Sequence, residues 1–167
     1  MNHDPVCSRC GQELKEGEFF RVDDRPVCTG CLYPGMKPIS FWPIGIVCSS
    51  YVHTEDGSRP REVTAEIHLL PSMEPFMDRL EDEKMLTVVY VFHRVENFTT
   101  RCVRRYDGKD VGVLASRSPH RPSRLAVQDV KLLRRKGTVL YVRGLDALDG
   151  SPVLDIKMQH PNHHKKD

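Results

Sequence analysis

Four cysteines near the start of the chain stand in two pairs whose spacing suits a tetrahedral metal ion. Two residues separate Cys7 from Cys10, two separate Cys28 from Cys31, and residues 11–27 lie between the pairs. Each short loop can present two thiolates to one ion, which is the ligand set of structural zinc sites. Because four thiolates leave no coordination position for water or substrate, the predicted Zn²⁺ folds its module and does not catalyse.

Two disulfides and a redox-active pair are the alternative interpretations of these cysteines. The N-terminus has neither the basic start nor the apolar stretch of a signal peptide, so we expect a cytoplasmic protein. Disulfides are rare in such a reducing environment. A redox pair would not need a matching second pair further along the chain.

Two polar segments further along offer groups for anion binding and acid–base chemistry. Residues 117–122 read Arg-Ser-Pro-His-Arg-Pro and place two guanidiniums and an imidazole on a loop stiffened by proline, which suits carboxylates or phosphates. Residues 144–157 bring three carboxylates beside the backbone amides of an Asp-Gly turn. A surface loop and an ordinary turn are the alternative interpretation.

The elements that would position these groups are mostly strands. Residues 62–70 alternate between apolar and polar, and residues 86–92 form a nearly unbroken apolar run, which indicates a central strand buried on both faces. We expect a mainly β fold, a small closed β-barrel of about seven to eight strands with one short helix over residues 74–82. The expected strands cover residues 41–52, 62–70, 86–92, 98–106, 111–116, 125–133, 138–142 and 153–157.

Composition divides the chain into three parts. The prolines and glycine of residues 33–38 oppose both helix and sheet, so a zinc-ribbon-like module is expected over residues 1–35 and the barrel over residues 39–158. Residues 159–167 are expected to form a flexible tail. We expect loss of the metal to unfold only the first module, because its few apolar residues cannot form a core alone.

The net charge of +2 conceals an uneven distribution. Residues 94–136 contain 12 Lys or Arg against 4 Asp or Glu, a local +8, so the remainder carries −6. A basic band of this kind points to a polyanionic partner, with a solvated face as the alternative. No run of 18 apolar residues occurs in the sequence, which excludes a membrane-spanning helix.

The two polar segments, with residues 43–47 (Pro-Ile-Gly-Ile-Val) and His93, resemble the TsaA-like, TrmO-type methyltransferase family over about residues 39–157. The resemblance is sharpest in residues 117–122 and 145–157. It implies a small β-barrel, a homodimer with cofactor sites near the subunit interface, and a methyl transfer from S-adenosylmethionine. The implied acceptor is threonylcarbamoyladenosine beside the tRNA anticodon, which makes tRNA the expected partner.

The resemblance also implies the cofactor-binding residues, which are Ser49, Ser50, Tyr51, Val111, Arg121, Gly144, Leu145, Asp146 and Ala147. Arg121 suits the methionine carboxylate, and turn amides and carbonyls suit the adenine edge. A proton must leave the acceptor nitrogen during the transfer, which requires a base or a water path. The catalytic candidates are His93, Arg117, His120, Asp149 and Asp155, of which Asp155 could instead orient Arg117.

The sequence departs from the family pattern mainly where a substrate would be recognised. Residues 123–126 read Ser-Arg-Leu-Ala in place of Asn-Pro-Ile-Gly, and residues 57–60 read Gly-Ser-Arg-Pro in place of Arg-Gln-Pro-Gly. Two alternatives therefore stand beside a tRNA methyltransferase. One is a methyltransferase for a protein or small-molecule acceptor, and the other is a non-catalytic zinc-ribbon protein that senses the cofactor.

Overall fold

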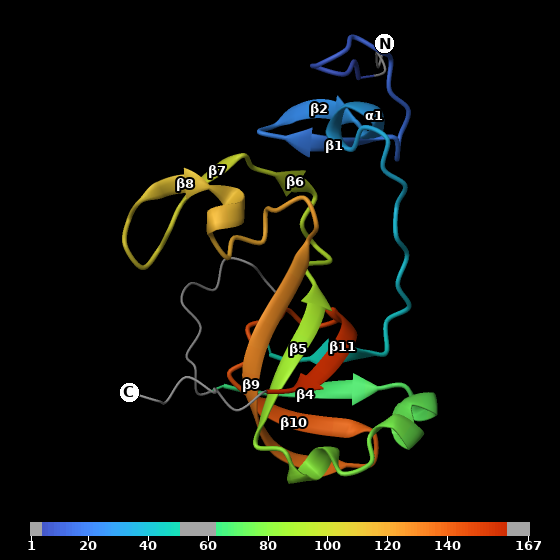
Figure 1. The fold of residues 1–167 in the computed structure, drawn as a ribbon, viewed down its shortest axis with the longest axis vertical. Helices are drawn as coiled ribbons and strands as arrows, with labels where there is room; N and C mark the ends of the chain where they lie inside the picture. The colour runs from blue at the N-terminus through green and yellow to red at the C-terminus, as the bar shows by residue number, and fades with distance from the viewer. Residues whose placement is uncertain (1–4, 51–62, 160–167) are drawn as a thin grey trace. The chain divides into compact units, whose positions relative to one another are not determined.

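The computed structural model describes residues 5–50 and 63–159 of the 167-residue chain. It divides into two compact units, one made of Met1–Ser40 with Arg94–Arg124 and the other of Phe41–His93 with Leu125–Asp167 (Figure 1). These boundaries differ from those expected, because residues 94–124 belong with the N-terminal module and not with the barrel. No helix among the described residues is long and apolar enough to cross a membrane.

The second unit is a closed barrel of six antiparallel strands in the order β10-β4-β3-β11-β5-β9. Its strands are β3 (Gly45–Cys48), β4 (Thr64–Leu69), β5 (Met85–Val91), β9 (Leu125–Lys136), β10 (Val139–Arg143) and β11 (Pro152–Met158). The predicted closed barrel is confirmed. Its strand count is lower than predicted because the segments expected as strands over residues 98–106 and 111–116 lie in the other unit.

The barrel core is filled from one face of each strand. Along β5, Leu86, Val88 and Tyr90 are buried while the residues between them are only half-buried. The run is therefore buried on one face, not on both as predicted, because a barrel strand turns only its inner side to the core. Gly45 pairs with Leu69 between β3 and β4, and a Cβ there would lie 2.5 Å from the carbonyl oxygen of His68.

The segment expected as one helix over residues 74–82 forms two short 3₁₀ helices, η1 (Pro71–Phe76) and η2 (Leu80–Asp82). Pro75 has no N–H to donate, and Arg79 has a left-handed φ of 60° that interrupts the turn between the two helices. Met77 is buried and Leu80 packs against the barrel core, whereas Phe76 is exposed.

The first unit combines two segments that are far apart in the sequence. Its N-terminal part contains β1 (Phe19–Val22), β2 (Arg25–Cys28) and α1 (Thr29–Leu32). The second segment contains β6 (Asn97–Phe98), then the hairpin of β7 (Arg101–Val103) and β8 (Asp110–Gly112), then η3 (Val113–Ala115). β6 pairs in parallel with β1, and the ring of Phe98 stacks on Phe20 with centroids 5.2 Å apart.

Candidate functional site

At one end of the barrel, hydrogen bonds link residues at the end of β3 to the segment between β10 and β11. The backbone N–H of Ser49 donates to a carboxylate oxygen of Asp149 at 3.0 Å, and its hydroxyl donates to the carbonyl of Ala147 at 3.1 Å. The N–H of Gly150 donates to the carbonyl of Val47 at 2.8 Å. The structure thus brings together Ser49, Asp149 and the turn of residues 144–147, all of which the sequence singled out.

Two residues that the sequence did not single out, Gln128 and Tyr90, hold this turn in place. The Gln128 amide donates to the carbonyl of Gly144 at 2.6 Å, and its carbonyl oxygen accepts the N–H of Asp146 at 2.9 Å. The hydroxyl of Tyr90, which is buried, donates to the carbonyl of Asp146 at 2.7 Å. A glutamine in an alternating strand looks like an ordinary solvent-facing position, so no signal in the sequence marks it.

The same turn leaves backbone groups for a ligand. Within the described residues, no hydrogen bond uses the N–H groups of Leu145 and Ala147 or the carbonyl of Leu145. Their side chains are buried and anchor the turn from beneath. A donor and an acceptor on one short stretch of backbone are what the edge of an adenine ring requires, so this turn fits the adenosine part of the expected cofactor.

His93 follows β5 at the same end of the barrel. A hydrogen bond of 3.3 Å joins its Nδ1 to the hydroxyl of Ser151, which is 2% exposed. A Cβ on Gly150 would lie 3.8 Å from Nε2 of His93. A buried serine therefore orients the imidazole. Asp149 accepts a hydrogen bond from Ser49, and Asp155 forms an ion pair of 2.7 Å with Lys157.

Arg117, His120, Arg121 and Val111 belong to the first unit, whereas Ser50 follows β3 in the second. The guanidinium of Arg121 donates to carbonyls of its own loop, at 3.0 Å to Ser118 and also to Ser116. It organises the loop, a role that the sequence did not suggest. Nδ1 of His120 lies 3.0 Å from the carbonyl oxygen of Asn97. Arg117 is exposed, Val111 lies in β8, Ser50 is exposed beyond β3, and Tyr51 lies outside the described residues.

The four paired cysteines converge in the first unit. The Sγ atoms of Cys7, Cys10, Cys28 and Cys31 all lie within 4.8 Å of one another, and those of Cys10 and Cys28 are 3.8 Å apart. Zinc–sulfur bonds of about 2.3 Å in a tetrahedron place the sulfurs about 3.8 Å apart. The donor set and its dimensions therefore fit a Zn²⁺ ion.

Backbone donors stabilise negative charge on this cluster. The N–H of Cys28 points at Sγ of Cys7 from 3.4 Å and lowers the pKa of that thiol to about 6. The N–H of Cys31 points at Sγ of Cys28 from 3.3 Å, while hydrogen bonding with the Cys28 and Cys10 sulfurs raises the pKa of Cys31 to about 12. Each thiolate opposes deprotonation of the neighbouring thiols, so four thiolates at neutral pH require a cation among them.

Comparison with known proteins identifies relatives of the barrel. Residues 52–164 match the family described as the tRNA-methyltransferase O N-terminal domain. A probable S-adenosyl-L-methionine-binding protein of Archaeoglobus fulgidus is 38% identical over 125 residues, which are 73% of this chain and 34% of that protein. A mouse tRNA (adenine(37)-N6)-methyltransferase is 33% identical over 101 residues, 52% of this chain and 23% of that enzyme.

The solved structures give the same picture of the fold. The crystal structure of TrmO from Pseudomonas aeruginosa superposes with a TM-score of 0.62 at 26% identity, covering 78% of this chain and 60% of that one. The chain thus spans about a third of the length of the Archaeoglobus relative and about 60% of the solved protein. The matched family begins at residue 52, so the cysteine module lies outside it.

Proposed function

Because the chain belongs to the tRNA-methyltransferase O N-terminal domain family, we propose that it transfers a methyl group from S-adenosylmethionine to N6 of threonylcarbamoyladenosine beside the tRNA anticodon. The observation that carries this proposal is the barrel end, where Gln128 and Tyr90 hold the turn of residues 144–147 with free backbone groups of the kind adenine needs. We further propose a homodimer, as the family resemblance implies, and a cytoplasmic location.

The residues of the barrel end would divide the work of the reaction. When bound, S-adenosylmethionine supplies a methyl group that is already activated by the sulfonium. Leu145 and Ala147 would hold the adenosine through their backbone groups, and Ser49 would keep the turn in register with β3. Such positioning is the main contribution that this chain must make to a methyl transfer.

His93 is our candidate for removing the proton from the acceptor nitrogen. Its Nδ1 is hydrogen-bonded to the buried hydroxyl of Ser151, which orients the imidazole at this end of the barrel, and an imidazole is a suitable base for such a proton. Asp149 is a positioning residue in this scheme, because its carboxylate accepts the Ser49 N–H. Arg121 would contribute by ordering residues 113–121, together with Arg117 and His120 on the same loop.

The cysteine cluster would hold a structural Zn²⁺. All four ligands come from the protein, which leaves no open position for chemistry at the metal. Its proposed role is to fold the module of β1, β2 and α1.

A labelled-methyl assay tests the proposed function. Purified protein is incubated with methyl-labelled S-adenosylmethionine and either total tRNA or total protein from cells that lack the gene. We expect label in tRNA, and we expect it to disappear when the tRNA lacks the threonylcarbamoyl group. Label in protein alone would replace the tRNA acceptor with a protein acceptor, and no label in either fraction would support a cofactor-sensing role.

A further inference from the structure

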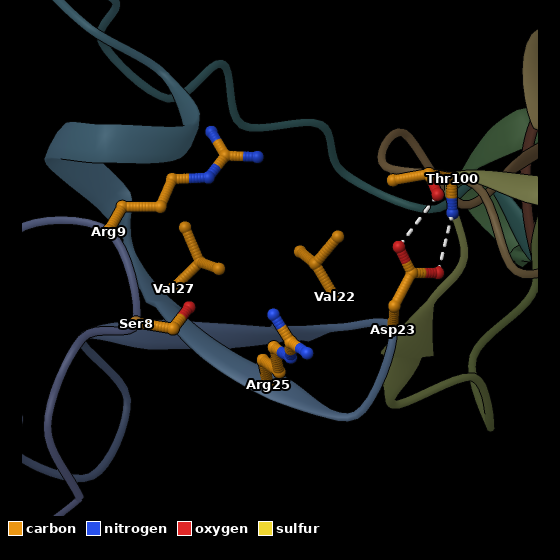
Figure 2. Close-up of a pocket in the computed structure, with 7 residues that line it drawn as sticks. All are labelled: Ser8, Arg9, Val22, Asp23, Arg25, Val27 and Thr100. Carbon is orange, nitrogen blue, oxygen red and sulfur yellow. Dashed lines mark hydrogen bonds between the residues drawn. The ribbon is translucent and has the colours of Figure 1, made fainter.

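A pocket of about 440 Å³ lies on the unit that carries the cysteine cluster, and the proposed function gives it no role (Figure 2). Val22 in β1 and Arg25 in β2 are paired directly, so their side chains share one face of the hairpin. Val27 lies on the same face, and the loop between Cys7 and Cys10 carries Arg9 beside it. The pocket therefore has an apolar floor of two valines, edged by two guanidiniums.

The charged side chains of the pocket differ in how many hydrogen bonds they make within the protein. Arg9 donates one N–H to the carbonyl of Cys31 at 3.1 Å, which orients the guanidinium and leaves its other donors for a ligand. Arg25 makes no side-chain hydrogen bond to any described residue, although its positive charge helps to lower the pKa of Asp23. Asp23 lies at the other end of the pocket from Arg9, where Thr100 engages both of its carboxylate oxygens (Figure 2). The available groups are thus cationic donors above an apolar surface.

Other arginines of this unit contrast with these two. Arg101 pairs with Asp110 at 2.9 Å, and Arg104 pairs with Asp107 at 2.5 Å. Residues 94–124, which complete the unit, contain 8 Lys or Arg and 3 Asp or Glu, a net +5. Residues 1–40 contain 5 Lys or Arg and 6 Asp or Glu, a net −1, so the whole unit carries +4. A net positive unit favours a polyanion, and two guanidiniums beside valines suit a phosphate joined to a sugar.

We propose that this pocket binds the RNA backbone, with a phosphate between Arg9 and Arg25 and its ribose over Val22 and Val27. The proposal rests on the proposed function, in that the RNA is the tRNA substrate. Contacts to the backbone fix the position of the nucleic acid without reading its sequence. The cysteine module would then be a second tRNA-binding element, apart from the barrel end where the methyl transfer is placed.

The experiment uses the full-length, zinc-loaded chain and labelled unfractionated tRNA. Binding is measured by fluorescence anisotropy at several salt concentrations for the parent, the double variant Arg9→Ala/Arg25→Ala, and the control Lys15→Ala/Lys37→Ala. The control removes the same charge from exposed positions of the same unit, outside the pocket. Zinc content and S-adenosylmethionine affinity, measured on each protein, verify that the variants are folded.

We expect the pocket variant to bind tRNA about three- to tenfold more weakly than the control. The slope of log affinity against log salt should be shallower by about 0.7–0.9, which corresponds to one phosphate. Equal affinities and slopes for the two variants would overturn the proposal, as would binding of a polyglutamate peptide, but not tRNA, that depends on Arg9 and Arg25. Methyl transfer to tRNA is measured separately. If tRNA binding depends on the pocket but no methyl group is transferred, the proposed function alone is refuted. If methyl transfer occurs and the pocket variant keeps the salt slope of the control, the pocket proposal alone is refuted.

Discussion

The carboxylate of Asp23 accepts two hydrogen bonds from Thr100, at 2.9 Å from the backbone N–H and at 2.6 Å from the hydroxyl. These bonds favour the charged carboxylate and so lower the pKa of Asp23 below its ordinary value. The carbonyl of Thr100 in turn accepts the N–H of Val113 at 3.0 Å, and the N–H of Thr99 donates to the carbonyl of His120 at 2.9 Å. The β1–β2 turn is thereby connected to the loop that carries Arg117, His120 and Arg121.

The first prediction compares the two neighbouring aspartates of this turn. Asp23 and Asp24 both have positive φ, at 47° and 62°, so glycine relieves similar backbone strain at either position. Asp23→Gly also loses both bonds to Thr100 and should lower the free energy of unfolding of the first unit by about 1 kcal/mol. Asp24→Gly should be neutral or stabilising. Hydrogen exchange at residues 98–100, measured during chemical denaturation, gives the stability of both variants. Equal stabilities would contradict the role of the Asp23–Thr100 bonds.

Removal of the metal should affect more than the N-terminal segment. Because β6 pairs with β1 and Phe98 stacks on Phe20, loss of Zn²⁺ should loosen residues 94–124 as well as residues 5–40. The sequence predicted unfolding of the first module alone. Hydrogen exchange after chelation, or in Cys28→Ala, should show faster exchange in both segments and unchanged protection of β5 and β9. Retained protection of residues 94–124 would show instead that this segment folds independently of the metal.

The barrel could be predicted because the local sequence pattern of its strands and turns is distinctive. Residues 64–69 alternate, and the turns at Gly137 and Gly150 have the positive φ that their glycines allow. β7 and β8 overlap the strands expected over residues 98–106 and 111–116, and they pair with each other across Asp107 and Gly108. The cysteines lie within metal-binding distance of one another, as their spacing suggested, since ligands only two residues apart are constrained by the local loop.

Contacts between distant parts of the chain could not be predicted. Nothing near Phe20 or Phe98 indicates that these rings stack, and the parallel pairing of β1 with β6 joins residues about 76 positions apart. The division of the chain therefore differed from the one expected. The role of Gln128 could not be predicted for a similar reason. Its partners in the 144–147 turn come close only when the barrel closes, and residues adjacent to it in the sequence do not indicate them.

The third prediction concerns Gln128. Gln128→Ala removes the donor to Gly144 and the acceptor from Asp146, so the turn should lose its fixed shape. We expect S-adenosylmethionine to bind more weakly by about 1–3 kcal/mol, the cost of leaving such groups unpaired. Calorimetry measures the affinity, with Val127→Ala as the control, because Val127 is an exposed neighbour in the same strand. Equal affinities of the two variants would remove Gln128 from the site.

The role of Arg121 can be decided with two ligands. If Arg121 binds the methionine carboxylate directly, Arg121→Ala should weaken S-adenosylmethionine but not 5′-methylthioadenosine, which lacks that carboxylate. The structure favours a role in ordering the loop, because the guanidinium donates to the carbonyls of Ser116 and Ser118. We therefore expect no selective loss of S-adenosylmethionine affinity, together with faster amide exchange at residues 113–121. A selective loss of S-adenosylmethionine binding would support the direct contact.

The basic band over residues 94–136 is less available to a polyanion than its charge suggests. Arg135 pairs with Glu81 at 2.8 Å, the guanidinium of Arg134 lies 3.4 Å from the ring centroid of Tyr141, and Arg104 is held by Asp107. These partners hold three of the guanidiniums in place, although only Glu81 adds a negative charge from outside the band. Arg105 is exposed and makes no side-chain hydrogen bond or ion pair with any described residue. Within the β7–β8 hairpin it is the arginine best placed to contact phosphate.

Comparison of Arg105→Ala with Arg104→Ala tests whether paired and unpaired arginines of the hairpin differ toward tRNA. Each variant removes one positive charge, but only Arg105 has its guanidinium available, so only Arg105→Ala should lose a phosphate contact. We expect its slope of log affinity against log salt to be shallower by about 0.9, the value for one phosphate of a duplex stem. Arg104→Ala should keep the parent's slope and instead destabilise the hairpin, because Asp107 loses its partner. Anisotropy titrations from 50 to 200 mM salt resolve the two cases. If both variants reduce the slope equally, tRNA responds to the overall charge of the hairpin and not to individual guanidiniums, and if neither does, the band faces solvent.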